Sequence, residues 1–196
     1  MQPSLKFRKI REIEWSIIRN SFEKISPKIL EFFKEKIDLF YVKISNIKSE
    51  SYPEIYLLNY DLNTIINKIS RNLSINIYSA GIYFGYIKRG KFYLSLEGAE
   101  YIFKNNLFPQ ERIIIVKESI EKAVLYGNHI KKKDIEQDVI KKYPFNKGDL
   151  ILIINKFHEV LALGRLTINS NKFEDKNYNE IIIQNLIDKG YYLRKE

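Results

Sequence analysis

The residue types on which most enzyme chemistry depends are scarce in this sequence. It has no cysteine and two histidines, His129 and His158. A zinc site needs several nitrogen or sulfur ligands, and a cysteine nucleophile needs a thiol, so neither is expected. Neither histidine stands at a recognisable spacing from a serine, which favours structural or surface roles for both. We therefore expect no metal site and no catalytic histidine.

Motifs that bind nucleotides or activate a serine are also missing. The sequence contains no G-x-G-x-x-G, no P-loop, no H-E-x-x-H and no G-x-S-x-G. Two pairs of carboxylates have helical spacing, Glu97 with Glu100 and Glu118 with Glu121. Acidic residues at the start of a helix are favoured by its dipole, so we interpret both pairs as solvated helix starts. The sequence thus predicts a protein that is not an enzyme and needs no cofactor.

The basic balance of the chain points to a polyanion as its partner. Its 196 residues carry a net charge of +9, and the pI is about 9.4. Nucleic acid is the commonest partner of such proteins, although a composition rich in Ile, Lys, Asn and Tyr could also produce the charge. No apolar run approaches the ~18 residues of a membrane span, and no signal peptide is visible at the start. We expect a cytoplasmic protein without membrane contact, nuclear or nucleolar if the cell is eukaryotic.

The first half of the sequence alternates helical and strand patterns. Apolar residues at helical spacing predict a helix from about Ile10 to Ile25, and Ser26-Pro27 is typical of the start of a second helix. A glycine in the Lys88–Gly90 turn favours a hairpin between 82–87 and 91–96. Ser95 can cap the helix that follows. Further strands are expected at 39–47 and 55–58, and further helices from Asp61 and over 97–103.

The second half reads as a series of short strands. A polar break at 105–110 places the domain boundary, so we expect domains at 1–109 and 110–196. Many short strands separated by turns suggest a small barrel. Strands are predicted at 112–116, 150–154, 159–168, 180–183 and 191–193, a helix at 118–124, and a charged amphipathic stretch at 131–143.

Three sequence blocks in this half resemble the PUA domain, the RNA-binding module named after pseudouridine synthases and archaeosine transglycosylases. They are A-V-L-Y-G-N-H-I at 123–130, K-G-D-L-I-L-I at 147–153 and E-V-L-A-L-G-R at 159–165. In that family a "G-N-H" turn precedes a helix, "G-D" enters a central strand, and "L-G" lies on the next strand. Gly148 can adopt a turn conformation closed to other residues. Gly164 indicates either a close approach, by RNA or another backbone segment, or a bulge.

With the upstream blocks S-A-G-I-Y-F-G-Y and K-F-Y-L-S-L, the chain also resembles the Nip-seven ("nuclear import seven") family of ribosome-biogenesis factors. The similarity covers roughly 79–165. It implies an α+β protein, with an N-terminal α/β pre-PUA domain containing an antiparallel sheet and a C-terminal β pseudo-barrel PUA domain. It also implies a non-catalytic RNA binder acting on pre-ribosomal RNA of the large subunit. Archaeal relatives in that family have been linked to the RNA-degrading exosome.

The resemblance also implies where RNA would bind. Carried over, the basic surface corresponds to Lys131, Lys132, Lys133 and Arg165, with Lys172 just beyond. The stretch after Arg165, L-T-I-N, is neutral where relatives are often basic. The lysine triplet could alternatively be a solvated helix start, and the hairpin turn Lys88–Lys91 could extend the RNA surface or be a charged turn only. Tyr143 and Phe157 could stack bases, but either fits a core position better.

Three hypotheses follow from these patterns. The first is an RNA-binding factor in large-subunit assembly, whose ligand is single-stranded or pre-ribosomal RNA, U/A-rich sequences included, with assembly proteins or the exosome as partners. The second is an accessory or RNA-modifying PUA protein, which would need a catalytic motif in the first 110 or so residues. The third is a protein–protein adaptor whose basic charge is incidental. The segment 171–196 extends past the resemblance and has no assigned role.

Overall fold

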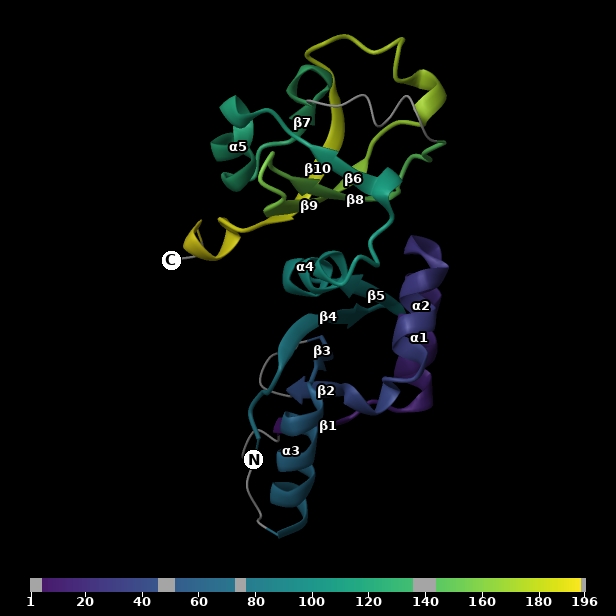
Figure 1. Ribbon diagram of the computed structural model, residues 1–196, viewed down its shortest axis with the longest axis vertical. Coiled ribbons are helices and arrows are strands. Elements are labelled where there is room, and N and C mark those ends of the chain that lie inside the picture. The colour runs from purple at the N-terminus through teal and green to yellow at the C-terminus, as the bar shows by residue number, and fades with distance from the viewer. Residues whose placement is uncertain (1–4, 46–51, 73–76, 136–143, 195–196) are drawn as a thin grey trace. The chain divides into compact units, whose positions relative to one another are not determined.

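The computed structural model describes residues 5–45, 52–72, 77–135 and 144–194. The chain divides into two compact units, Met1–Leu107 and Phe108–Glu196, and the sequence-based boundary lies at residue 109. The fold is mixed α+β, as expected, with a five-stranded sheet in each unit (Figure 1). None of the helices in the described ranges is long and apolar enough to span a membrane.

The first unit is an antiparallel sheet with helices. The strand order is β1-β2-β3-β4-β5. The edge strand β1 was not predicted, because its five residues alternate charged and apolar side chains too briefly to stand out. The elements are β1 Leu5–Lys9, α1 Glu12–Ile25, α2 Pro27–Lys34, β2 Phe40–Ser45, β3 Glu54–Leu57, α3 Tyr60–Asn72, β4 Ile82–Lys88, β5 Lys91–Leu94 and α4 Leu96–Lys104.

Phenylalanine rings join the helices to one face of this sheet. Phe22 of α1 and Phe33 of α2 each pack against Phe40 of β2 and Phe84 of β4, and all four side chains are fully buried. Ser26 begins α2 by accepting the amide of Lys28, and Ser95 begins α4 by accepting that of Gly98. Both predicted caps are confirmed. They satisfy backbone amides that a helix start leaves without an internal partner.

The second unit is built on a curled sheet of order β6-β8-β9-β10-β7. Strands β6 and β8 run parallel, and the other pairs are antiparallel. Val116, after β6, bridges to Ile135, after β7, so the two edges of the sheet meet. This contact produces the predicted pseudo-barrel. The elements are β6 Ile113–Ile115, α5 Glu118–Leu125, β7 Ile130–Lys131, β8 Leu150–Ile154, β9 Val160–Leu166 and β10 Ile181–Asp188.

Two secondary-structure predictions for this unit were wrong. The segment 191–193 was predicted as a strand but lies in a 3-10 turn, Tyr191–Arg194. The lysine triplet does not begin a helix, because it spans the end of β7 and a 3-10 turn, Lys132–Asp134. The remainder of the predicted amphipathic stretch, 136–143, lies outside the described residues. The segment 171–196, which had no assigned role, supplies β10, an inner strand of the sheet between β9 and β7.

Close packing inside this sheet accounts for Gly164. A Cβ at this position would lie 2.4 Å from Cγ2 of Ile183 in β10 and 2.9 Å from Cδ1 of Ile153 in β8. The close approach left open by the sequence is therefore made, within the fold, by the two neighbouring strands. At the other predicted turn, Gly148 has a φ of 97°, as expected, and the Asp149 carboxylate accepts the amide of Asn146 at 2.9 Å.

We predict that Gly164→Ala lowers the free energy of unfolding by about 1–3 kcal/mol, because the added methyl overpacks a buried position. Urea unfolding followed by circular dichroism measures this change. Gln184→Ala, whose side chain is exposed on the neighbouring strand, is the control and should shift stability by less than about 0.5 kcal/mol. An unchanged midpoint for Gly164→Ala would contradict the packing account.

Candidate nucleic-acid interface

The glycine of the Y-G-N-H block ends helix α5. Gly127 has a φ of 87°, and its amide donates to the carbonyl of Val124 at 2.9 Å. The amide of Asn128 donates to the carbonyl of Ala123 at 3.0 Å. These two bonds form a Schellman motif, whose left-handed residue is usually glycine. The turn thus follows a helix and leads into β7, so the expectation that it precedes a helix was wrong.

A buried asparagine of β10 holds this turn in place. The side-chain amide of Asn185 donates to the carbonyls of Val124 at 2.9 Å and Asn128 at 3.4 Å. The backbone amide of Asn185 donates to Nδ1 of His129 at 3.3 Å. The imidazole is therefore oriented by β10 while the residue stays exposed. This contact agrees with the structural or surface role expected for His129.

The turn after β7 is fixed by backbone hydrogen bonds. The Asp134 carboxylate accepts the amide of Lys131 at 2.9 Å, and the Asp134 carbonyl accepts the amide of Lys117 at 3.0 Å. The amides of Lys132 and Lys133 donate to carbonyls in the segment just before β10, each at 3.0 Å. The lysine triplet therefore has a defined backbone conformation, and successive side chains leave it in different directions.

Lys132 is engaged inside the fold. Its ammonium donates to the carbonyl oxygens of Glu174 at 3.1 Å and Lys176 at 3.0 Å, and its side chain is only 12% exposed. The same nitrogen lies 4.8 Å from the ring centroid of Phe173 and 5.8 Å from that of Tyr178. These contacts join the lysine turn to the 173–178 segment. Lys132 is therefore held within the fold rather than presented to a ligand.

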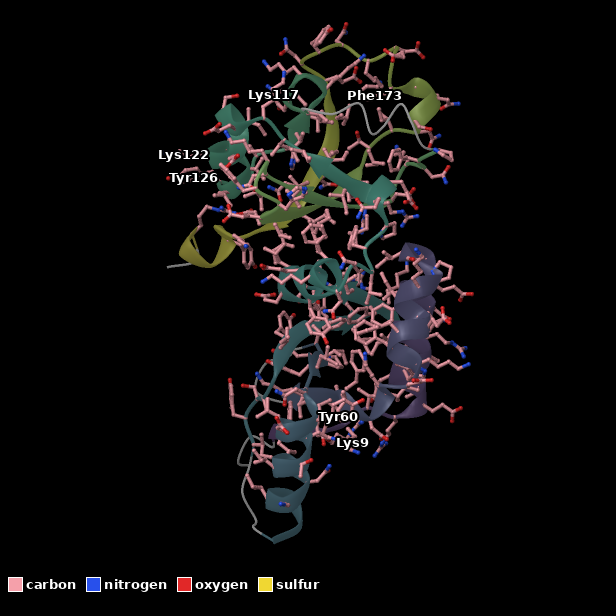
Figure 2. All side chains as sticks on the ribbon, in the orientation of Figure 1. Lys9, Tyr60, Lys117, Lys122, Tyr126 and Phe173 are labelled. Atoms are coloured by element: carbon pink, nitrogen blue, oxygen red, sulfur yellow. The ribbon has the colours of Figure 1, made fainter. Side chains whose placement is uncertain are left out.

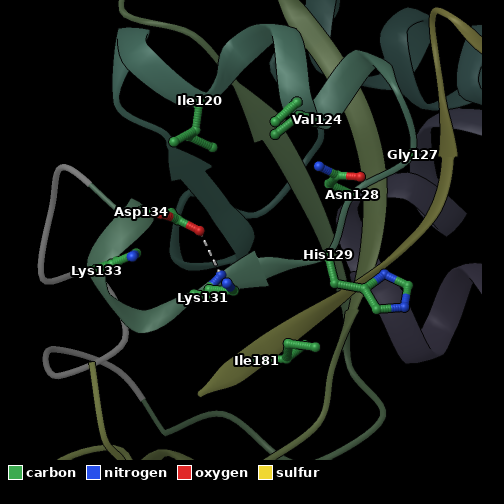
Figure 3. Close-up of a pocket in the computed structure, with 10 residues that line it drawn as sticks. Ile120, Val124, Gly127, Asn128, His129, Lys131, Lys133, Asp134 and Ile181 are labelled. Carbon is green, nitrogen blue, oxygen red and sulfur yellow. Dashed lines mark hydrogen bonds between the residues drawn. The ribbon is translucent and has the colours of Figure 1, made fainter. Parts of the chain in front are cut away.

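Lys131 and Lys133 instead line a groove between α5, the G-N-H turn and β7. Its volume is about 470 Å³. Figure 3 shows Lys131, Lys133 and Asp134 on one side of it, with Asn128 and His129 on the other. Apolar side chains complete the wall. The residues that line it are Ile120, Ala123, Val124, Gly127, Asn128, His129, Lys131, Lys133, Asp134 and Ile181.

Two acidic groups beside the groove, Asp134 and Glu180, are already engaged. Asp134 is buried and accepts the amide of Lys131. Glu180, next to the groove residue Ile181, accepts a hydrogen bond from the Lys176 ammonium, which lowers the pKa of the Glu180 carboxyl below its ordinary value. The groove therefore offers two ammonium groups for an anion, and an apolar wall with an amide and an imidazole for an aromatic heterocycle.

An exposed tyrosine directly precedes the groove residue Gly127 in the chain. Tyr126 is the C-cap of α5 and is 61% exposed, and the Lys122 ammonium lies 6.0 Å from its ring centroid. Figure 2 labels both side chains at the outer end of the helix. Sequence reasoning used Tyr126 only as part of the motif. Its position directly before Gly127, where the helix was expected to end, could have indicated that the Tyr126 side chain is exposed.

The other predicted contact residues lie outside the groove lining. Arg165 is exposed near the end of β9, and Lys172 is exposed in the 3-10 turn Ser170–Lys172. Phe157 is 69% exposed in the loop between β8 and β9, so the expectation that it is a core residue was wrong. Lys156 covers its ring at 5.1 Å. Tyr143 lies outside the described residues.

The carboxylate pairs considered in the sequence are only partly solvated, because Glu97 and Glu121 are half-buried and each has one carboxylate oxygen shielded from water, so the interpretation of both pairs as solvated was wrong for these two residues. Glu118, at the start of α5, pairs with Lys156, and Glu100 pairs with Lys104. His158 occupies the β8–β9 turn with a φ of 61°. Within the described part of the chain, no group of three histidine or carboxylate side chains could hold a metal ion.

Comparison with known proteins identifies the second unit. Residues 112–196 match the family model described as the UPF0113 PUA domain. A curated relative from Archaeoglobus fulgidus, named a UPF0113 protein, is 26% identical over 150 residues, which is 76% of this chain and 78% of the relative. The C-terminal part of the chain is thus a PUA domain, as the sequence blocks indicated.

Solved structures agree over nearly the whole chain. A conserved PUA domain protein from Thermoplasma acidophilum has a TM-score of 0.59 at 14% identity, covering 96% of this chain and 97% of that one. A PUA domain structure from Aeropyrum pernix, in complex with tartrate, has a TM-score of 0.57 at 12% identity, covering 97% and 90%. At these identities the similarity shows the fold.

The different environments of adjacent lysines predict different effects on stability. Lys132→Ala should lower the free energy of unfolding by about 2 kcal/mol, because it removes charge-assisted hydrogen bonds to two carbonyls. Lys133→Ala, the matched control with an exposed side chain, should change it by less than about 0.5 kcal/mol. Urea unfolding of the two variants measures both values. Equal effects would mean that Lys132 is not part of the fold's internal contacts.

Proposed function

We propose that this protein binds single-stranded RNA through the groove of its PUA domain and that it has no catalytic activity. The observation that carries the proposal is the pair Lys131 and Lys133, which face an apolar wall inside a domain of an RNA-binding class. The net charge of +9 supports a polyanion as ligand.

In this proposal Lys131 and Lys133 contact phosphates. Lysine ammonium groups attract phosphate without reading bases, so binding should be salt-dependent and only weakly sequence-specific. The apolar wall and the exposed ring of Tyr126 offer surfaces for an unstacked base. Bases are accessible in this way in single strands and loops rather than in duplexes. U/A-rich RNA, which stays unpaired most readily, suits such a site.

We further propose that the RNA is pre-ribosomal and that the protein serves assembly of the large ribosomal subunit. The resemblance of the 79–165 region to the Nip-seven family supports this step. Large-subunit assembly proteins or the exosome would be its protein partners. No observation favours the RNA-modifying alternative, and the adaptor alternative makes a different prediction in the RNA-binding test below.

Charge reversal of the groove should weaken RNA binding uniformly across sequences. A plot of log K against log salt has a negative slope. For Lys131→Glu with Lys133→Glu, this slope should become shallower by about 1.4, which corresponds to two lost contacts with single-strand phosphates. Fluorescence anisotropy with single-stranded and duplex RNA of matched length, over a salt series, measures the slope.

Lys28→Glu with Lys34→Glu is the matched control, because both residues are exposed on α2 of the first unit and the charge change is identical. This control should lose less affinity than the groove variant and keep the slope nearer to that of the wild type. Equal effects of the two variants would contradict the groove. Absence of RNA binding by the wild type at low salt would favour the adaptor.

Loss of the protein in its own cell should reduce large ribosomal subunits relative to small ones. Sedimentation of ribosomal particles through a sucrose gradient after depletion measures the ratio. Rescue by the wild type but not by the groove variant would connect this phenotype to RNA binding. An unchanged ratio would sink the ribosomal assignment while leaving RNA binding open to the anisotropy test.

A further inference from the structure

The hairpin of the first unit places aromatic and basic side chains together on one face. In the pairing of β4 with β5, Tyr86 lies opposite Tyr93, and Lys88 lies opposite Lys91. Residues two apart on a strand point to the same face, and paired residues share a face. These two tyrosines and two lysines therefore form a single cluster, on the face opposite the phenylalanine core.

A bulge in β4 makes this arrangement possible. Ile55 of β3 pairs with Gly85, but the next residue of β3 pairs with Tyr83, so Phe84 is the extra residue. Gly85 has a φ of 149°, and a Cβ there would lie 2.1 Å from a backbone carbonyl oxygen of β5. The bulge lets Phe84 enter the core while Tyr83 and Tyr86, three residues apart, face the other way.

A third tyrosine extends the cluster into a column of rings. The rings of Tyr86 and Tyr93 are nearly parallel, 8° apart, with centroids 5.1 Å from each other. Tyr52 lies 5.9 Å from Tyr86 and is 38% exposed, and the Lys88 ammonium lies 4.5 Å from the Tyr52 ring centroid. We call the five residues Tyr52, Tyr86, Tyr93, Lys88 and Lys91 the tyrosine platform.

The electrostatics of the platform favour an anion. The sequence from Ile82 to Leu94 has three basic residues and no acidic one. Glu54 of β3 lies opposite Tyr86 in the sheet, and its carboxylate is bound by the Lys43 ammonium at 3.1 Å and the Tyr56 hydroxyl at 2.8 Å. The nearest strand therefore adds little net negative charge to the platform.

The platform occupies the end of the face that α3 does not fill. Leu62 and Ile66 of α3 pack with Phe7, Tyr41 and Tyr56, which come from β1, β2 and β3. The platform side chains belong to β4, β5 and the chain just before β3, and Tyr86 and Tyr93 are half-buried. A partner that carries both negative charge and flat apolar rings would match this surface.

We propose that the tyrosine platform is a second RNA contact, which stacks bases of a single strand while Lys88 and Lys91 contact its phosphates. Aromatic columns flanked by cations bind single strands in this way, because every base has a face that can stack. The platform rests on the proposed function, since the ligand is the same RNA, but its residues lie in the other unit. It supplies base stacking where the groove supplies mainly charge.

The test compares an oligouridylate of about 12 nucleotides with an abasic phosphodiester strand of equal length, using the full chain. It is made in two backgrounds, the wild type and Lys131→Glu/Lys133→Glu. In the second background the oligouridylate should still bind about ten-fold more tightly than the abasic strand. Adding Tyr86→Leu/Tyr93→Leu should remove most of this difference, leaving only what the apolar wall of the groove and Tyr126 contribute. Tyr86→Phe/Tyr93→Phe should keep it, because phenylalanine retains the rings.

A further pair of substitutions guards against misfolding of the leucine variant. Lys88→Glu/Lys91→Glu leaves the rings in place. It should make the slope of log K against log salt shallower by about 1.4. If the leucine and glutamate variants both bind oligouridylate like their parent, the platform is overturned and the groove is unaffected. If the groove reversal alone abolishes all preference for bases, the platform is likewise overturned. If the wild type binds no RNA, both sites fail together.

Discussion

The pairing of β10 with both β9 and β7 is the contact on which the PUA unit and its groove depend. β10 lies near the end of the chain, yet it stands between two strands that precede it by many residues. Its Asn185 bonds the end of α5, and the segment just before it accepts the amides of the lysine turn. The groove is therefore assembled only when the last part of the chain has joined the sheet.

This dependence separates the roles of neighbouring lysines. Lys132 binds two carbonyls of the 173–178 segment and so helps to hold the approach to β10. Lys131 and Lys133 leave the same turn toward the groove. A short tract of like charges thus divides into one residue that stabilises the fold and two that are placed to meet a ligand.

The two units combine charge and rings in different proportions. The groove has two lysines, an apolar wall and the neighbouring ring of Tyr126, whereas the tyrosine platform has a column of three rings with two lysines. Both arrangements depend on a glycine with positive φ. Gly127 closes α5 so that the turn reaches β7, and Gly85 allows the bulge that brings Tyr83 and Tyr86 to one face.

The fold was predictable where local rules determine it. Ser26, Ser95, Gly148 and the β4–β5 hairpin carry signals that read directly as caps and turns. The pairing of β10 with β7 and the contacts of Lys132 were not predictable, because they join residues more than forty positions apart in the sequence. Arg165 and Lys172 were predicted as RNA contacts from the family resemblance. A resemblance aligns residues along the sequence, but it does not show that they lie on the same surface as Lys131 and Lys133. The groove was found only when α5, β7 and β10 were placed together.

The central claim, that RNA occupies the groove of the PUA unit, is tested most directly by photo-crosslinking. Single-stranded RNA containing 4-thiouridine would be irradiated with the full chain, and crosslinked peptides would be identified by mass spectrometry. We expect the RNA to crosslink to residues in the range 117–135, which contains α5, the G-N-H turn and β7. These crosslinks should be lost as the salt concentration is raised. Crosslinks in the PUA unit confined to β8 and β9, or unaffected by salt, would contradict it.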